Sequence, residues 1–90
     1  MESFEWHKEK AELNIKKHNV SFEEAITVFD DTLGIYKTDD EHSIGEERCY
    51  LIGNSIKNRL LVVSFTERGN NIRIITARIA TKNERKYYES

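Results

Sequence analysis

The chain of 90 residues has no proline, one cysteine and no long apolar run. The single cysteine, Cys49, cannot form an intramolecular disulfide, which fits a reducing compartment. No apolar stretch approaches the roughly 20 residues of a membrane span. The acidic start, MESFEWHKEK, lacks the apolar segment of a signal peptide. Because this length is too short for two hydrophobic cores, we expect a single cytoplasmic domain over residues 1–90 that does not bind membranes.

The sequence also lacks the residues that several classes of functional site require. The three dispersed histidines, His7, His18 and His42, and the lone cysteine do not have the spacing of a zinc or iron–sulfur site. The acidic residues between Asp30 and Glu41 lack the glycine and the Asp/Asn ladder of a calcium loop. Neither a phosphate-binding glycine-rich loop nor a G-x-S-x-G motif is present. We therefore expect a protein without a metal ion or a cofactor.

The hydrophobic pattern predicts an α+β fold. The pattern is typical of helices before Gly34, of strands after Gly34, and of a helix again over the last ten residues. Two helices, four strands and a last helix give the order α-α-β-β-β-β-α, and short polar turns favour a four-stranded, mainly antiparallel sheet. The predicted helices are Lys8–Lys17, Ser21–Asp30 and Thr81–Tyr88, and the predicted strands are Leu33–Thr38, Arg48–Gly53, Leu60–Glu67 and Asn71–Arg78.

The first predicted helix has an apolar face and a polar stripe. One face comprises Ala11, Ile15 and His18, with Leu13 beside them. The polar stripe comprises Lys10, Asn14 and Lys17 and carries two ammonium groups.

Helix ends and one strand carry further local signals. Ser21 with Glu24, and Thr81 with Glu84, are predicted capping boxes, in which each side chain bonds the other residue's backbone N–H. The unbroken apolar run Leu60–Val63 lacks the alternation of a half-exposed strand. It predicts a central strand that is covered on both faces.

The net charge of −2 conceals an uneven distribution along the chain. Residues 1–56 carry 6 Lys+Arg and 13 Asp+Glu, a net charge of −7, whereas residues 57–86 carry 8 and 2, a net charge of +6. Five of the eight cations in the basic segment are arginines, whose guanidinium groups match phosphate oxygens. Arg73 and Arg78 lie inside a predicted strand, which would aim them from a rigid backbone. The alternative is that these arginines pair with the acidic residues of the first half.

The remaining Arg, Lys, Glu and His residues suffice for RNA cleavage without a metal ion. The 2′-hydroxyl of RNA is the nucleophile, so the protein must supply a base, an acid and cations for the phosphorane. Glu47 or Glu67 could act as the base, and His18 could act as acid or base. Composition makes this chemistry possible but does not select it.

Short motifs over nearly the whole chain occur in the order and at the approximate spacing of a known family. The motifs are Phe4-Glu5-Trp6, Lys10, Asn14, Lys17 to Ala25, Phe29-Asp30-Asp31, Glu46-Glu47-Arg48, Ile52-Gly53, Thr66-Glu67-Arg68, Ile72 to Arg78, and Glu84-Arg85 with Tyr87. Together they resemble the BrnT toxins. The resemblance implies a RelE-like ribonuclease fold, metal-free RNA cleavage that arrests growth, and neutralisation by a BrnA-like antitoxin. It also implies that operator DNA is contacted only through the antitoxin, in a hetero-oligomer with an antitoxin dimer.

The resemblance also assigns roles to individual positions. Arg48, Arg73 and Arg78 are expected to contact the phosphate and the transition state. Glu47 or Glu67 is expected to act as the base, and His18 is either an acid–base residue or a histidine that bonds carbonyls at a helix end. The residues expected to bind RNA are Lys17, Arg68 and Lys82.

Two alternatives stay open at this point. Trp6, Phe22 and Phe29 are interpreted as core residues, although Trp6 could instead stack on an RNA base. His7 stands where the family usually has an aspartate, and Ile79 replaces a customary lysine. These departures leave a second hypothesis beside the ribonuclease: a toxin-fold protein that has lost catalysis and retains antitoxin binding and autoregulation.

Overall fold

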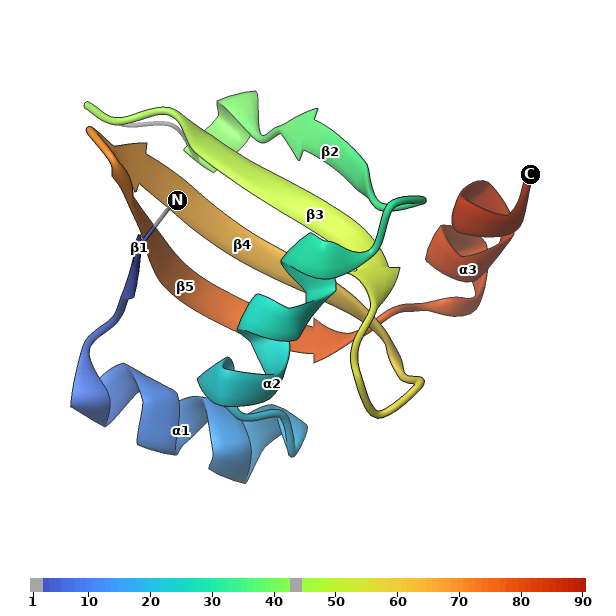
Figure 1. Cartoon of the computed structure of the whole chain (residues 1–90), viewed down its shortest axis with the longest axis horizontal. Coiled ribbons are helices and arrows are strands. Elements are labelled where there is room, and N and C mark those ends of the chain that lie inside the picture. The colour runs from blue at the N-terminus through green and yellow to red at the C-terminus, as the bar shows by residue number, and fades with distance from the viewer. Residues whose placement is uncertain (1–2, 43–44) are drawn as a thin grey trace.

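The computed structural model describes residues 3–42 and 45–90, which form three α-helices and one five-stranded sheet (Figure 1). The strand order is β1-β5-β4-β3-β2; β1 runs parallel to β5, and all other neighbours are antiparallel. None of the described helices combines the length and hydrophobicity needed to cross a membrane. The strands are β1 Ser3–Glu5, β2 Ile35–Thr38, β3 Arg48–Asn54, β4 Leu60–Arg68 and β5 Asn71–Ile79. The helices are α1 Lys8–His18, α2 Phe22–Thr27 and α3 Lys82–Glu89, with short 3₁₀ helices η1 Val28–Asp30 and η2 Asp40–His42.

The predicted α+β class and element order are confirmed, but the sheet has one strand more than predicted. β1 pairs in parallel with β5, with Phe4 opposite Ile72, so the sheet is mixed. Three residues are too few to show an alternating pattern, and only the edge of β5 makes them a strand. The remaining elements begin and end within about two residues of the predicted positions, except that the second helix is α-helical only to Thr27 and continues as η1 to Asp30.

The central strand β4 is covered on both faces, as the run Leu60–Val63 predicted. On one face, Leu61, Val63 and Phe65 point into the main core beneath α1 and α2. This core also holds Phe22, with Trp6 and Phe29 packed against it, so the interpretation of all three aromatics as core residues is confirmed. On the other face, a smaller cluster is completed by the last helix; its members are Ile52, Leu60 and Val62, with Tyr50, Ala80 and Tyr88 against them.

A bulge in β5 changes the face to which its side chains point. Ser64 pairs with Thr76 whereas the next residue, Phe65, pairs with Ile74, so Ile75 is an extra residue in β5. In a regular strand, residues an odd number of positions apart point to opposite faces. The extra residue therefore places Arg73 and Arg78 on the same face, the one turned away from α1 and α2.

Helix α1 packs on β5 through Asn14 of its polar stripe, whereas Lys10 and Lys17 of the same stripe are exposed. Leu13 is 62% and Ile15 47% exposed, whereas Asn14 is 5% exposed. The Asn14 amide Nδ2 donates to the carbonyls of Ala77 (2.7 Å) and Val20 (2.9 Å), and its Oδ1 accepts from the Ala77 N–H (3.1 Å). Beyond the end of β1, β5 offers unpaired backbone groups that only a polar side chain can satisfy.

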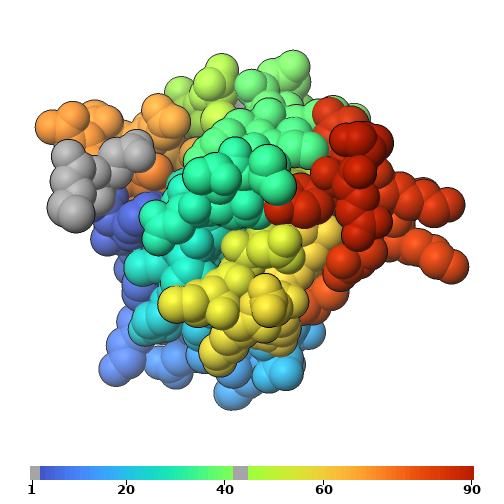
Figure 2. Space-filling view, turned by 45° about the vertical axis from the view of Figure 1, so that its right-hand side comes forward, coloured from blue at the N-terminus to red at the C-terminus, as the bar shows by residue number. Residues whose placement is uncertain are grey.

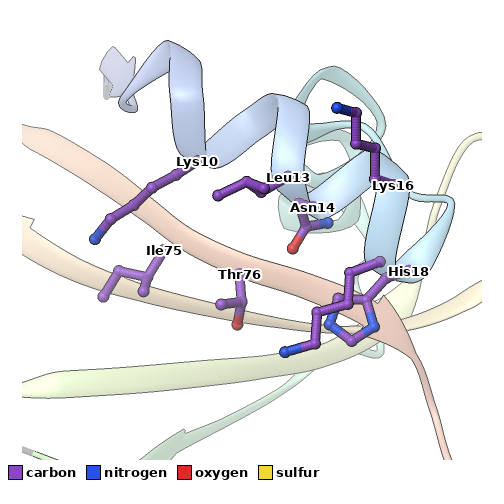
Figure 3. A pocket seen from close by; sticks show the side chains of 8 residues that line it. Lys10, Leu13, Asn14, Lys16, His18, Ile75 and Thr76 are labelled. Carbon is purple, nitrogen blue, oxygen red and sulfur yellow. The ribbon is translucent and has the colours of Figure 1, made fainter.

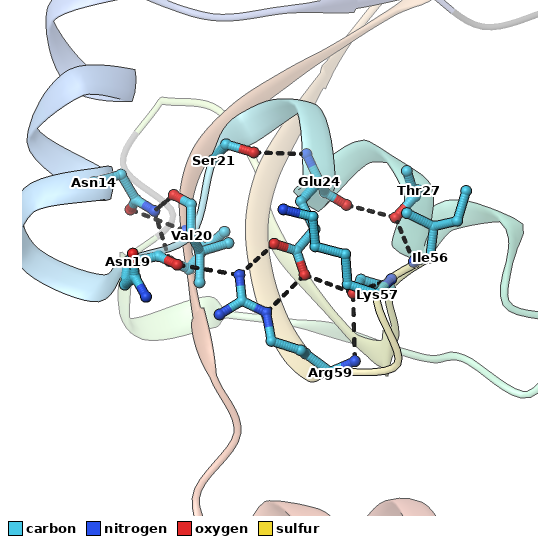
Figure 4. Close-up of polar contacts among 11 residues, drawn as sticks. Asn14, Asn19, Val20, Ser21, Glu24, Thr27, Ile56, Lys57 and Arg59 are labelled. Carbon is cyan, nitrogen blue, oxygen red and sulfur yellow. Dashed lines mark hydrogen bonds and ion pairs between the residues drawn. The ribbon is translucent and has the colours of Figure 1, made fainter.

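The two predicted capping boxes have different outcomes. In α3, Thr81 and Glu84 make both bonds of the box. At α2, the Ser21 hydroxyl accepts from the Glu24 N–H at 3.0 Å, but the buried Glu24 carboxylate binds Arg59 and the Ser55 hydroxyl instead of closing the box (Figure 4). The hydrogen bond from Arg59 outweighs burial and holds the pKa of Glu24 below its ordinary value. Glu24 therefore ties α2 to the turn between β3 and β4.

The last helix is attached to the body of the protein through Tyr88. Its hydroxyl donates to Asp31 Oδ2 at 2.6 Å and accepts from Asn54 Nδ2 at 3.2 Å. Asp31 Oδ2 also accepts from the Asn54 N–H at 2.7 Å. Figure 2 shows the result from outside, with α3 against the segment before β2 and the turn after β3. These bonds hold α3 over one end of the sheet.

We predict that Asn14→Ala destabilises the protein, because it leaves the backbone N–H and C=O of Ala77 buried without partners. The expected loss is about 2–4 kcal/mol in the free energy of unfolding, measured by urea denaturation. Asn83→Ala, at an exposed position of α3, is the matched control and should change stability by less than about 0.5 kcal/mol. Equal effects at the two positions would contradict the role given to Asn14.

Candidate active site

The face of the sheet turned away from α1 and α2, which we call the open face, carries three of the predicted site arginines. Its side chains form successive rows across β3, β4 and β5. The first row is Arg48, Thr66 and Arg73, the second is Tyr50, Ser64 and Thr76, and the third is Ile52, Val62 and Arg78. The last helix packs against the third row. The open face is therefore polar at the end where β3 begins and apolar beneath α3.

Arg48 and Arg73 stand on either side of Thr66, with which both are in register. Since neighbouring strands are about 4.8 Å apart, their Cα atoms are separated by about 10 Å, within the reach of two arginines on one phosphate. Arg78 is in register with Val62, four residues along β4 and therefore about 13 Å from the first row. The structure thus brings Arg48 and Arg73 together in one row and places Arg78 in another, beside Glu84 of the last helix.

Most of the arginines in the basic segment are bound to carboxylates. The pairs are Arg59 with Glu24, Arg68 with Glu46 (2.8 Å), Arg73 with Glu5 (2.7 Å) and Arg78 with Glu84 (2.8 Å). Three of these four partners come from the acidic first half, so the alternative that the charged segments pair with each other is confirmed for those three. A phosphate that binds Arg73 or Arg78 must share the guanidinium with a carboxylate or displace it.

The pair at α3 is the most strongly held of those at the open face. Arg78 Nη1 and Nη2 donate to the two oxygens of Glu84, each at 2.8 Å. These hydrogen bonds hold the pKa of Glu84 at about 2. Burial acts against them and raises the pKa, whereas the backbone N–H of Thr81 lowers it further. Glu84 thereby caps α3 and orients Arg78 with one carboxylate.

The two predicted bases lie away from the open face. Glu67 follows a residue of the first row, so its side chain points to the opposite face, where it lines a small pocket with Cys49. Glu47 is exposed and accepts a weak hydrogen bond from Cys49 Sγ at 3.9 Å. Burial, and then the charges of Glu47 and Glu67, raise the pKa of the Cys49 thiol. The structure groups both carboxylates around Cys49 and not beside Arg48 and Arg73.

Lys17 and His18 line a separate cleft of about 520 Å³ between α1 and the edge of β5 (Figure 3). Lys10 and Lys16 add two more cations, and Thr76 belongs both to this cleft and to the open face. Within residues 3–42 and 45–90, none of the three lysines makes an ion pair. The cleft therefore holds positive charge that is not neutralised, and it joins the open face at the second row.

The other two predicted RNA-binding residues lie at the margins. Arg68 ends β4 and is bound to Glu46, and Lys82 is an exposed residue at the start of α3. The sequence marks His7 only as a departure from the family's usual aspartate, and the structure places its Nε2 3.0 Å from Nη1 of Arg73. This contact could not be predicted without β1, because the pairing of Glu5 with Arg73 in that strand brings His7 to the open face.

Comparisons with known proteins agree with these observations. A family model described as "Ribonuclease toxin, BrnT, of type II toxin-antitoxin system" matches residues 6–84. No curated protein matches the chain. The crystal structure of the Brucella abortus ribonuclease toxin BrnT is similar, with a TM-score of 0.67 and 20% identity, covering 91% of this chain and 100% of that one. At this identity the structural likeness supports the fold alone.

We predict that the Arg78–Glu84 pair makes stability depend on acid pH. The pKa of Glu84 is about 2 in the folded chain against an ordinary value of 4.5, so its contribution is complete above pH 4.5 and is lost as the pH falls toward 2. Allowing for the partial exposure of Arg78, this loss should be about 1–2 kcal/mol. In urea denaturation from pH 2 to 6, the wild type should lose this much more stability than Glu84→Gln, because Glu24, whose pKa is also lowered, contributes equally to both proteins. Glu89→Gln, on the same helix, should retain the wild-type dependence.

Proposed function

The chain belongs to the BrnT family of ribonuclease toxins of type II toxin–antitoxin systems, and we propose that it cleaves RNA on its open face without a metal ion. The observation that carries the proposal is the placement of Arg48 and Arg73 on either side of Thr66. Two arginines whose backbones flank one residue in this way can both reach the non-bridging oxygens of one phosphate and stabilise the charge that develops on them. Thr66 offers a hydroxyl between them.

In the proposed reaction, the 2′-hydroxyl oxygen attacks the adjacent phosphorus as the bond to the 5′-oxygen breaks. A base takes the 2′-hydroxyl proton, and the departing 5′-oxygen gains a proton. The products are a 2′,3′-cyclic phosphate and a 5′-hydroxyl. The sequence predicts three acid–base residues. His18 lies in the cleft that joins the open face. Glu47 and Glu67 lie near Cys49 on the other face, so they could act only on RNA that passes around the end of the sheet.

Protein groups alone can supply this chemistry. Among the described residues, no three His, Cys, Asp or Glu side chains are grouped so that they could hold a metal ion. The cations of the open face are arginines, which remain charged at any biological pH. The nucleophile is part of the substrate, so the protein needs no activated Cys or Ser. These features support cleavage that is independent of metal ions.

We propose that RNA extends from the open face into the cleft beside α1. Lys10, Lys16 and Lys17 are cations without ion-pair partners in the described part of the chain, so phosphates can bind them without displacing a carboxylate. Thr76 lies on the route between the two surfaces. Arg68 and Lys82 are proposed as outer contacts.

Membership of the family implies a cognate antitoxin. We propose that this partner is a BrnA-like, DNA-binding protein whose carboxylates occupy the arginines of the open face in place of RNA phosphates. The ion pairs of Arg73 with Glu5 and of Arg78 with Glu84 show that these arginines accept carboxylate partners. In the proposed assembly, an antitoxin dimer binds the toxin, and operator DNA is contacted through the antitoxin.

We predict that purified, antitoxin-free protein cleaves single-stranded RNA in excess EDTA and leaves 2′,3′-cyclic phosphate ends. Arg48→Ala and Arg73→Ala should each lower the cleavage rate by roughly 100- to 1,000-fold, because each removes a donor to the charged phosphorane. The rate is measured by gel electrophoresis of a labelled RNA, and the ends by mass spectrometry.

The matched control is Arg85→Ala, because Arg85 lies on the outer helix and its contact with Glu89 is 3.8 Å long. This variant should cleave at the wild-type rate. RNA that carries a 2′-O-methyl group at every position should stay intact. Cleavage that stops in EDTA, or that persists on the methylated RNA, would overturn the proposed mechanism.

We also predict that the double variant Lys10→Ala, Lys17→Ala binds RNA less tightly and that its affinity for RNA depends less steeply on salt concentration. Each lost contact with a phosphate of single-stranded RNA should reduce the slope of log affinity against log salt by about 0.7, so the double variant should lose about 1.4. Affinity for 2′-O-methyl RNA is measured by fluorescence anisotropy from 50 to 300 mM salt. The control with equal loss of charge is Lys57→Ala with Lys86→Ala. An equal change in both double variants would indicate general attraction and no binding in the cleft.

A further inference from the structure

We propose that His7 takes the proton from the 2′-hydroxyl of RNA. This inference rests on the proposed cleavage at the open face. His7 is the N-cap residue of α1, with φ −83° and ψ 129°, yet its side chain makes no capping hydrogen bond. Asp, Asn, Ser and Thr are preferred at this position because their oxygen accepts from the first turn of the helix. The side chain of His7 turns instead to the open face, where its Nε2 lies 3.0 Å from Nη1 of Arg73.

The chemistry of this contact defines the state of the imidazole. An arginine can only donate hydrogen bonds, so Nε2 of His7 must be the acceptor. Accepting this bond requires the tautomer with the ring proton on Nδ1, in which the Nε2 lone pair is directed at Arg73. A neutral imidazole in this tautomer is a base that is ready to receive a proton.

Arg73 has enough donors to hold His7 and a phosphate together. Its Nε and Nη2 donate to Glu5 Oε2 at 3.1 and 2.7 Å, and its Nη1 contacts His7. A guanidinium has five N–H groups, so two are left for phosphate oxygens. A phosphate bound there lies next to the imidazole. The other charged groups around His7 are Lys8, Glu9 and Lys10 on its own helix, which line an adjoining surface pocket.

The proposed step balances as follows. When RNA binds, Nε2 of His7 stops accepting from Nη1 of Arg73 and instead accepts a hydrogen bond from the 2′-hydroxyl of the nucleotide. The O2′–P bond forms as the P–O5′ bond breaks; Nε2 of His7 takes the proton from O2′, and water gives a proton to the departing 5′-oxygen. The imidazolium then returns its proton to solvent. Glu5 takes no part in the proton transfer and holds Arg73 beside the reacting phosphate through two hydrogen bonds.

The test compares His7→Asn and His7→Ala with the wild type, in EDTA and on the same labelled RNA. Asn is a good N-cap residue and carries no basic group, so His7→Asn should fold and should cleave at least 100-fold more slowly. The affinity of both variants for 2′-O-methyl RNA should stay within twofold of the wild type. Added imidazole should restore cleavage by His7→Ala, increasingly as the pH rises and more of the reagent is unprotonated. Glu12→Gln, at an exposed position of the same helix, is the control and should cleave at the wild-type rate with or without imidazole.

The outcomes separate this inference from the proposed function. Loss of cleavage with rescue by imidazole supports proton transfer by His7. If both variants cleave at the wild-type rate, the inference is overturned and the ribonuclease proposal stays intact. A loss of cleavage that imidazole does not rescue also overturns the inference, because it assigns His7 to positioning alone. Wild-type protein that does not cleave RNA in EDTA overturns the proposed function itself.

Discussion

One extra residue in β5 determines which side chains can work together. Without Ile75, Arg73 and Arg78 would project from opposite faces of the sheet, because their separation of five positions is odd. The same shift keeps Ile74 and Ala77 in the core on the other side. A bulge thus lets one strand deliver apolar residues to the core along its whole length and still collect its arginines on the open face.

The second constraint is the edge of the same strand. β1 covers β5 only as far as Arg73, and beyond it the Asn14 amide takes the place of a neighbouring strand. This bond turns α1 so that Leu13 faces outward and the lysines of the polar stripe line a cleft. The backbone of an edge strand therefore sets the orientation of the helix, and the orientation of the helix sets where unpaired positive charge lies.

Charge in this protein has to be counted in space and not along the chain. The segment 57–86 has a net charge of +6, but four of its five arginines bind carboxylates at short range, three of them from the acidic half. The lysines of α1 belong to the half with a net charge of −7, yet no ion pair neutralises them in the described structure. Paired arginines are oriented by their carboxylates, whereas the lysines can bind phosphates without displacing a partner.

The sequence by itself determined the α+β class, the order of seven elements, the central position of Leu60–Val63 and the identity of the family. These follow from local periodicity, capping residues and motifs, which act over a few positions. Tertiary structure alone decided the rest: the parallel strand β1, the bulge, the burial of Asn14 and the meeting of Glu5, His7 and Arg73. Each of these depends on hydrogen bonds between segments far apart in the chain, for which a single sequence carries no local signal.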